Sequence, residues 1–388
     1  MQLPEFCPNP RCLYHYHDVT PVPRSLGPPG GRWYARKGGY YTQVRGRVQR
    51  FRCRCCGTGF SEQTFSIDYY AKRIIPYEQL DEKNGSTGSL RDNARAFGIS
   101  PATVSNKLSR LARQAIAAHN RCVSELKPDE PLATDGFESF TYSQYFPNNY
   151  NLLLGATSQF LIGATYCTIR RKGRMTVFQK RKRAALEDLY RPASGALYHS
   201  FHSLLDEAVP VVARYAGTPP QEIRSDEKRE YRLALQRHPF YAPLLASGKL
   251  RHRRVSSRVA RRRSNPLFAV NYFDRELRKD MANHVRETVC FARNVNSAME
   301  RFWIYAVRHN TVKRYRERQP RKDNSTHASV AGIPERIVRS AREHYYTRRA
   351  FFSRQKHLPA SQILLWRRQL ETPLHPNGNF TLPRYAVA

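Results

Sequence analysis

Three aspartates stand where an acid-poor chain could assemble metal chemistry. The 388 residues include 31 acidic side chains against 66 Lys and Arg. Asp135 follows an apolar pair, Asp226 ends the run QEIRSD, and Asp274 opens a basic helical stretch. Carboxylates from two neighbouring strands and a helix can hold two Mg²⁺ or Mn²⁺ ions, which activate an attacking oxygen and stabilise a leaving oxygen. The pattern predicts in-line phosphoryl displacement with Asp135, Asp226 and Asp274 as catalytic metal ligands.

Each aspartate also has a simpler interpretation. An Asp before Gly, as in Asp135-Gly136, is commonly a turn residue, Asp226 can cap a helix, and Asp274 can pair with an arginine one turn later. Their order along the strand pattern favours the metal site. The chain has no Walker loop, nucleophile elbow or convincing dinucleotide fingerprint that would offer another reaction.

The N-terminal cysteines predict a second, structural metal site. Cys7 and Cys12 bracket four residues, and Cys53 and Cys56 bracket two in CRCCG. Two such pairs on tight turns can present four thiolates to one Zn²⁺, and a metal clip explains how a Gly/Pro-rich segment folds. The one-residue spacing from Cys53 makes Cys55 a poor ligand, so we prefer Cys56. Reduced cysteines without metal are the alternative.

A helix–turn–helix is the clearest local motif, in SLRDNARAFGISPATVSNKLSRLARQ. Gly98 suits the left-handed end of a first helix, and Ser100 and Pro101 suit the start of a second. Ile99, Val104, Leu108 and Leu111 form the expected buried stripe. An ordinary helical hairpin is the alternative. The residues expected to face DNA bases and phosphates are Thr103, Ser105, Asn106, Lys107 and Arg110.

The elements that must position these residues predict an α/β chain in four parts. Strand-like runs at 132–140, 150–157, 160–170, 221–227 and 248–257 alternate with helical patterns at 197–216, 230–238, 273–289 and 296–310. We expect a zinc-ribbon-like module at 1–66, a helix–turn–helix domain at 67–125, a catalytic domain at 126–310 and a basic C-terminal extension at 311–388.

The net charge of +35 points to an anionic partner, and nucleic acid is the usual one. Two runs without acids, 170–183 and 249–263, could bind phosphates or form solvated faces. No stretch has the ~18 apolar residues needed to span a bilayer, and the N-terminus lacks the order of a signal peptide. We therefore expect a cytoplasmic protein, associated with the bacterial nucleoid and without a membrane partner.

The order of these parts resembles DDE/DDD insertion-sequence transposases, which have a zinc-ribbon-like N-terminus, a helix–turn–helix and a ribonuclease-H-like catalytic domain. The resemblance covers roughly residues 5–315. Its motifs are CPNPRC, FRCRCCGTGF, TDGFESF, SDEKREY and VNYFDRELRKDMANHVRETVCFARN. In the last of these, Asn271 and Asp274 take the positions of an Asn and an acid one turn apart, and Arg286, Thr288 and Phe291 continue the pattern.

The resemblance implies that Asp135, Asp226 and the helix acid bind the metals. We also expect Arg278 and Arg286 to contact DNA, and the protein to work as a homo-oligomer on double-stranded terminal inverted repeats and target DNA. The helix acid departs from the commoner pattern, because Asp274 stands where relatives have Glu; Glu287 is a third-choice candidate. Two alternatives remain: a non-catalytic DNA-binding regulator, including a domesticated transposase, and a nuclease of the same fold without strand transfer.

Overall fold

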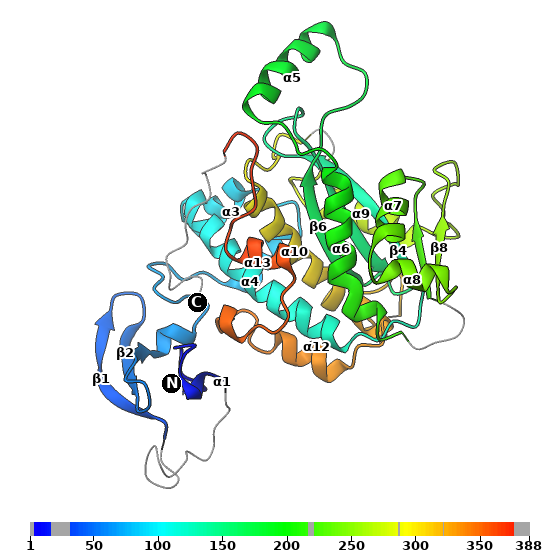
Figure 1. Ribbon diagram of the computed structural model, residues 1–388. Coiled ribbons are helices and arrows are strands. Elements are labelled where there is room, and N and C mark those ends of the chain that lie inside the picture. Colours follow the sequence, from blue (N-terminus) through cyan, green and yellow to red (C-terminus); the bar gives the residue numbers. More distant parts are fainter. Residues whose placement is uncertain (1–3, 17–31, 216–220, 286–287, 321, 376–388) are drawn as a thin grey trace.

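The computed structural model describes residues 4–16, 32–215, 221–285, 288–320 and 322–375. They form an α/β protein with one three-stranded and one five-stranded sheet. Figure 1 shows the smaller sheet at one side of a larger body built around the five strands. No helix in these ranges is long and apolar enough to cross a membrane.

The N-terminal module is an antiparallel sheet packed on aromatic side chains. Its elements are α1 (Leu13–Tyr16), β1 (Tyr34–Thr42), β2 (Gly46–Cys53), β3 (Gly59–Ser61) and the short η2 (Glu62–Phe65). Phe6, Trp33, Phe51 and Phe60 pack in one cluster with Phe351 from the far end of the chain. The module therefore depends on contacts from outside the predicted range 1–66.

Three helices follow: α2 (Tyr77–Asn84), α3 (Leu90–Phe97) and α4 (Pro101–Glu125). Ser89 starts α3 with a capping box, since its hydroxyl accepts from the Asp92 N–H while Asp92 accepts from the Ser89 N–H. Gly98 ends α3 at φ 62°, a left-handed conformation that costs a glycine little. Ser100 then caps α4 by accepting from the Thr103 N–H at 3.2 Å. The turn at Gly98 and the cap at Ser100 agree with the sequence prediction.

The large sheet has the strand order β6-β5-β4-β7-β8. The first three are antiparallel neighbours and the last two add in parallel. β4 agrees with the predicted run at both ends. The bounds are β4 Leu132–Phe140, β5 Pro147–Gly155, β6 Leu161–Thr168, β7 Gln221–Ser225 and β8 Leu250–Arg254.

Helices cover both faces of this sheet. Leu152 and Leu154 of β5 pack in the cluster that contains α9, while Leu153 between them packs in the cluster that contains α6. Successive side chains of a strand point to opposite faces, so α6 and α9 lie on opposite sides. The helices are α5 Val177–Leu189, α6 Ala196–Val212, α7 Arg229–Arg237, α8 Tyr241–Ala246, α9 Phe268–Asp280 and α10 Val295–Thr311.

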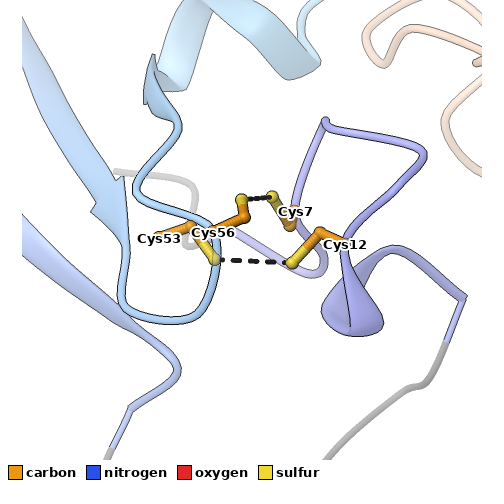
Figure 2. Close-up of side chains that lie close together, drawn as sticks. All are labelled: Cys7, Cys12, Cys53 and Cys56. Atoms are coloured by element: carbon orange, nitrogen blue, oxygen red, sulfur yellow. Dashed lines mark hydrogen bonds between the residues drawn. The ribbon is translucent and has the colours of Figure 1, made fainter.

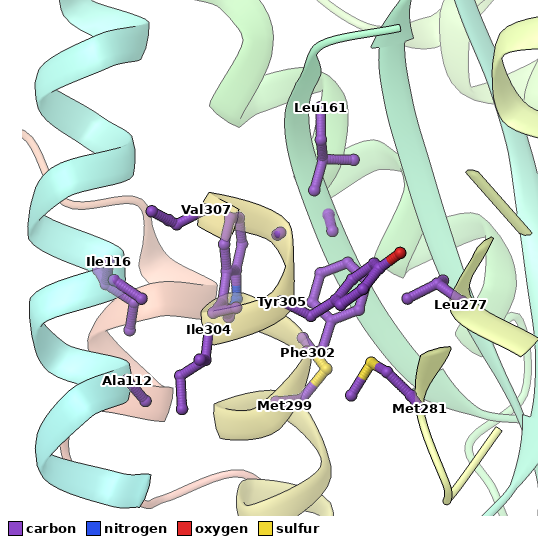
Figure 3. Packing of buried hydrophobic residues seen from close by; sticks show 14 of the residues in the cluster. Ala112, Ile116, Leu161, Leu277, Met281, Met299, Phe302, Ile304, Tyr305 and Val307 are labelled. Atoms are coloured by element: carbon purple, nitrogen blue, oxygen red, sulfur yellow. The ribbon is translucent and has the colours of Figure 1, made fainter. Parts of the chain in front are cut away.

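The helix α10 joins the sheet to the helix–turn–helix. Figure 3 shows its side chains between Ile116 of α4 on one side and Leu161 of β6 and Leu277 of α9 on the other. One hydrophobic cluster therefore runs from α4 through α10 to β5 and α9. The sequence analysis placed a domain boundary at residues 125–126. In the structure, the same hydrophobic core continues across that boundary.

The predicted helix 273–289 is wrong at both ends. Observed α9 begins at Phe268 and ends at Asp280. Beyond it the chain turns inward, and the His284 ring packs edge-on against Phe137 at 5.0 Å. This tertiary contact ends the helix where the sequence has no proline or glycine.

The C-terminal residues pack onto the rest of the molecule as short helices. These are α11 (His327–Val330), α12 (Glu335–Arg342), η3 (Phe352–Arg354) and α13 (Ala360–Trp366). Trp366 is buried in the main cluster, and Arg354 donates to the His15 carbonyl of the N-terminal module at 2.7 Å. The segment thus bridges the module and the body, which its polar, basic composition did not predict.

Candidate metal and nucleic-acid sites

Asp135 and Asp226 lie at neighbouring positions on the parallel pair β4 and β7. Ala133 pairs with Arg224, and the same register continued by two residues places Asp135 opposite Asp226. The Gly136 N–H donates to Asp135 Oδ1 at 2.7 Å, and the Lys228 N–H donates to Asp226 Oδ1 at 3.0 Å. Backbone donors therefore orient both carboxylates beside the C-terminal end of β7.

Asp274 approaches the same region from α9. Asp135 shares its face of β4 with Ala133 and Phe137, which pack in the cluster that contains α9. On α9, Asp274 stands four residues after Val270 and three before Leu277, so it lies on the buried stripe. The strand alternation and the helix stripe thus direct Asp135 and Asp274 toward each other.

Lys228 is a cation between the two strand acids, and the sequence analysis did not assign it. Its Nζ lies 3.6 Å from Asp135 Oδ1 and 3.5 Å from Asp226 Oδ2. Burial opposes its charge, but the attraction of Asp135 and Asp226 outweighs burial and raises the pKa of Lys228. The signal was its place two residues after Asp226 in SDEKRE.

Asp274 has an incomplete environment. Its Oδ1 is buried without a hydrogen-bond partner. Burial and the charge of Asp135 raise the pKa of Asp274 to about 8, although Arg278, Arg261 and Lys228 lower it. An ionised carboxylate in such a place needs a cation. The orphaned oxygen and the hard carboxylate donors fit a divalent ion such as Mg²⁺.

The three acids are not drawn together into a compact ligand set in this structure. The groups whose ligand atoms all lie within 4.8 Å, among the described residues, are Cys7/Cys12/Cys53/Cys56 and His202/Asp206/His238. The prediction that Asp135, Asp226 and Asp274 bind Mg²⁺ therefore stays a prediction. What the structure provides is three acids in one region with Lys228 between two of them.

The four predicted cysteines form a compact cluster that could hold a metal ion (Figure 2). Cys7 Sγ lies 3.6 Å from Cys56 Sγ, and Cys12 Sγ lies 3.6 Å from Cys53 Sγ. Four thiolates bound tetrahedrally with Zn–S bonds of about 2.3 Å have sulfurs roughly 3.8 Å apart. Cys55 is exposed and outside the cluster, as the spacing predicted.

The exposed face predicted for α4 is only partly correct. Asn106 is exposed, and Thr103 and Ser105 are half-buried. Lys107 was expected outside but is 3% exposed, and its ammonium pairs with buried Asp68. Lys107 lies on the stripe of Val104 and Leu111, so its assignment as a DNA contact is wrong.

Two of the arginines predicted to contact DNA bind other parts of the protein, and the third lies outside the described residues. Arg110 donates to the Ile67 and Tyr69 carbonyls at 2.8 Å each. Arg278 donates to the Glu138 carbonyl at 3.0 Å and stacks over Phe137. Arg286, like Glu287, lies outside the described residues. Arg110 thus holds the backbone of residues 67 and 69 beside the helix–turn–helix, and Arg278 holds the Glu138 backbone near the acids.

A hollow of about 540 Å³ lies at the turn between α3 and α4. Arg73, Arg91 and Arg95 line it together with Ser100 and Pro101, where α4 begins. Helix N-termini carry partial positive charge, and guanidiniums complement phosphate. The hollow can therefore accept an anionic group beside the expected recognition helix.

Both basic runs are largely exposed, as a phosphate-binding surface requires. In the run 249–263, every arginine and Lys249 are exposed, and Arg261 is close enough to the acids to lower the pKa of Asp274. The run 170–183 leads into α5, which has no buried residue and projects from the body in Figure 1. Within it, Lys180, Arg181 and Lys182 are exposed, while Arg183 pairs with Glu187.

The His202/Asp206/His238 group has the spacing of a metal site but the wrong proton positions. His238 Nδ1 accepts from the Phe240 N–H at 3.1 Å, so a neutral ring carries its proton on Nε2. That Nε2 faces Asp206 Oδ1 at 2.9 Å. A protonated nitrogen cannot ligate a metal, and the group instead ties α6 to the end of α7.

Comparison with known protein families, with curated proteins and with solved structures gave no match to this chain. The fold and the sites are therefore interpreted from their own geometry and chemistry.

Proposed function

We propose that this protein is a DNA transposase of the DDE/DDD type, which cleaves and joins DNA strands with divalent metal ions. The observation that carries the proposal is that Asp135 and Asp226 share the Lys228 ammonium, while Asp274 on α9 lies near enough to Asp135 for the charge of Asp135 to raise the pKa of Asp274 further than burial alone. Asp274 Oδ1 is also buried without a partner.

The architecture supports a ribonuclease-H-like catalytic domain. Its mixed sheet of five strands, with helices on both faces, places one acid on β4, a second directly after β7 and a third on α9. Parallel neighbours β4 and β7 bring the first two together although they are far apart in sequence. Asp274 lies on α9, which packs on one face of the sheet.

In the proposed reaction, Asp135, Asp226 and Asp274 would hold two Mg²⁺ or Mn²⁺ ions. Bound metal supplies activation of the attacking oxygen and stabilisation of the leaving oxygen. The Gly136 N–H and the Lys228 N–H keep two carboxylates oriented. Arg261 and its exposed neighbours add positive charge beside the acids, where the DNA backbone would lie.

End recognition is assigned to the helix–turn–helix and the N-terminal module. Asn106 is exposed for base contacts, and the arginine-lined hollow at the start of α4 suits a backbone phosphate. Structural Zn²⁺ on the four cysteines would hold the module, and Phe351 fixes it to the body. A homo-oligomer on the two transposon ends is part of the proposal.

A non-catalytic DNA-binding regulator is the second candidate. The observation that favours it is that the three acids do not form a compact ligand set, while the Lys228 ammonium already pairs with two of them. Such a protein would keep the recognition surface and bind DNA without cutting it.

The two candidates differ in their products on DNA that carries the sequences flanking the gene. A transposase with Mg²⁺ produces specific nicks or breaks at the element ends and joined products in a target plasmid, and EDTA stops both. Specific binding to those ends with intact DNA at every metal concentration identifies the regulator instead. Cleavage at the ends with no joined product identifies the nuclease alternative.

A further inference from the structure

The Lys228 ammonium lies between two proposed metal ligands, Asp135 and Asp226. Its Nζ is nearly equidistant from Asp135 and Asp226, at 3.6 and 3.5 Å, and it lies 5.5 Å from the centre of the Tyr231 ring. Its side chain is 29% exposed, and the two carboxylates are 22% and 21% exposed. The ammonium therefore has a path to solvent.

Removing this cation would leave two carboxylates side by side with the third nearby. Burial raises the pKa of Asp135 and the charge of Asp226 adds to that rise; burial likewise raises the pKa of Asp274, and the charge of Asp135 adds to it. Like charges at such a site oppose ionisation. One positive charge at Lys228 offsets part of this repulsion when no metal is bound.

We propose that Lys228 is an internal substitute for the metal ion: it holds Asp135 and Asp226 in place and must be displaced when a divalent cation binds. This proposal rests on the proposed function, because it assumes that these acids are the metal ligands. Lys228 is thus a positioning residue that sets the cation concentration at which the site fills. It touches neither the reacting phosphate nor the attacking oxygen.

The test is Mn²⁺ binding to the full-length, zinc-loaded protein without DNA, followed by electron paramagnetic resonance and calorimetry. Lys228→Met removes the competing ammonium and is expected to bind Mn²⁺ about tenfold or more tightly than the original protein. Lys83→Met is the matched control, since Lys83 is exposed on α2, and it keeps the original affinity. Asp226→Asn is expected to abolish the site in either background.

Each result separates the two proposals. Unchanged or weaker Mn²⁺ binding in Lys228→Met, with binding still lost in Asp226→Asn, overturns the role of Lys228 alone. Absence of any Mn²⁺ site sensitive to Asp226→Asn overturns the metal site and the Lys228 proposal with it. If Lys228→Met does not fold, Lys228→Gln is titrated by the rise of its Tm with Mn²⁺, which is expected at lower Mn²⁺ than for Lys83→Met.

Discussion

Glu207 is a half-buried acid outside the proposed site, and its surroundings make stability depend on pH. Its Oε1 accepts from the Ser361 hydroxyl at 2.5 Å, while Oε2 is buried without a partner. Burial raises the pKa of Glu207 to about 7, although the Ser361 hydrogen bonds lower it. The folded state therefore binds this proton more tightly than the unfolded state, whose pKa is near 4.5.

The penalty from Glu207 is absent below pH 4.5, grows as pH rises and is complete above about pH 7. We expect Glu207→Gln to stabilise the protein by about 1–3 kcal/mol at pH 8 and by almost nothing at pH 4. Thermal unfolding of both proteins across this range measures the difference. A gain that is the same at pH 4 and pH 8 would contradict the assignment.

On α4, one turn carries a structural lysine beside an exposed asparagine. Lys107→Met would leave Asp68 buried without its cation, which costs about 3 kcal/mol of stability. Asn106→Ala removes an exposed side chain and should change stability by less than about 0.5 kcal/mol.

For DNA binding, we expect the reverse order: Asn106→Ala has the larger effect on affinity and Lys107→Met the smaller. At a temperature where both are folded, Asn106→Ala is expected to weaken specific binding by about 1–3 kcal/mol, and Lys107→Met to bind as the original protein does. Denaturant unfolding and fluorescence anisotropy provide the two measurements. Specific binding that depends on Lys107 and not on Asn106 would mean that this face of α4 does not read DNA.

The helix α5 is expected to bind the DNA backbone without reading its sequence. Changing Lys180, Arg181 and Lys182 together to Gln removes three exposed charges from an element with no buried residue, so folding should be unaffected. Binding to any duplex should weaken. The slope of the logarithm of the binding constant against the logarithm of the salt concentration should become less steep by up to about three. A salt dependence equal to that of the original protein would assign α5 to a solvated face.

How far the sequence predicted the elements depended on whether their partners were local. β4 was predicted from its own run of residues, in which Asp135 follows an apolar pair, and the caps of α3 and α4 from residues within one turn. The end of α9 and the burial of Lys107 depend on Phe137 and Asp68, which are distant in sequence. Lys228 was missed because its contact with Asp135 exists only through the pairing of β4 with β7.

At the scale of the whole molecule, the zinc-ribbon-like module is attached by the C-terminal segment and should depend on metal for its own order. We expect about one zinc per chain, since one cluster of four cysteines has the fitting geometry. Cys53→Ser should lose that zinc, while Cys55→Ser should keep it, because Cys55 is exposed and outside the cluster.

Metal analysis of the purified proteins by plasma mass spectrometry measures the zinc content. Less than one zinc per chain in the original protein, or equal loss in both variants, would remove the zinc assignment. The continuous cluster from α4 to the sheet should leave the body folded after chelation, so circular dichroism should change little.

The account as a whole stands on Asp135 as a metal ligand for DNA cleavage. The most direct measurement is Mg²⁺-dependent strand cleavage of DNA carrying the element ends, by Asp135→Asn and by the matched control Asp129→Asn, whose side chain is exposed just before β4. The account predicts cleavage by the control at the original rate and a loss of at least about a hundredfold in Asp135→Asn, with DNA binding retained. Cleavage by Asp135→Asn at the original rate would contradict it.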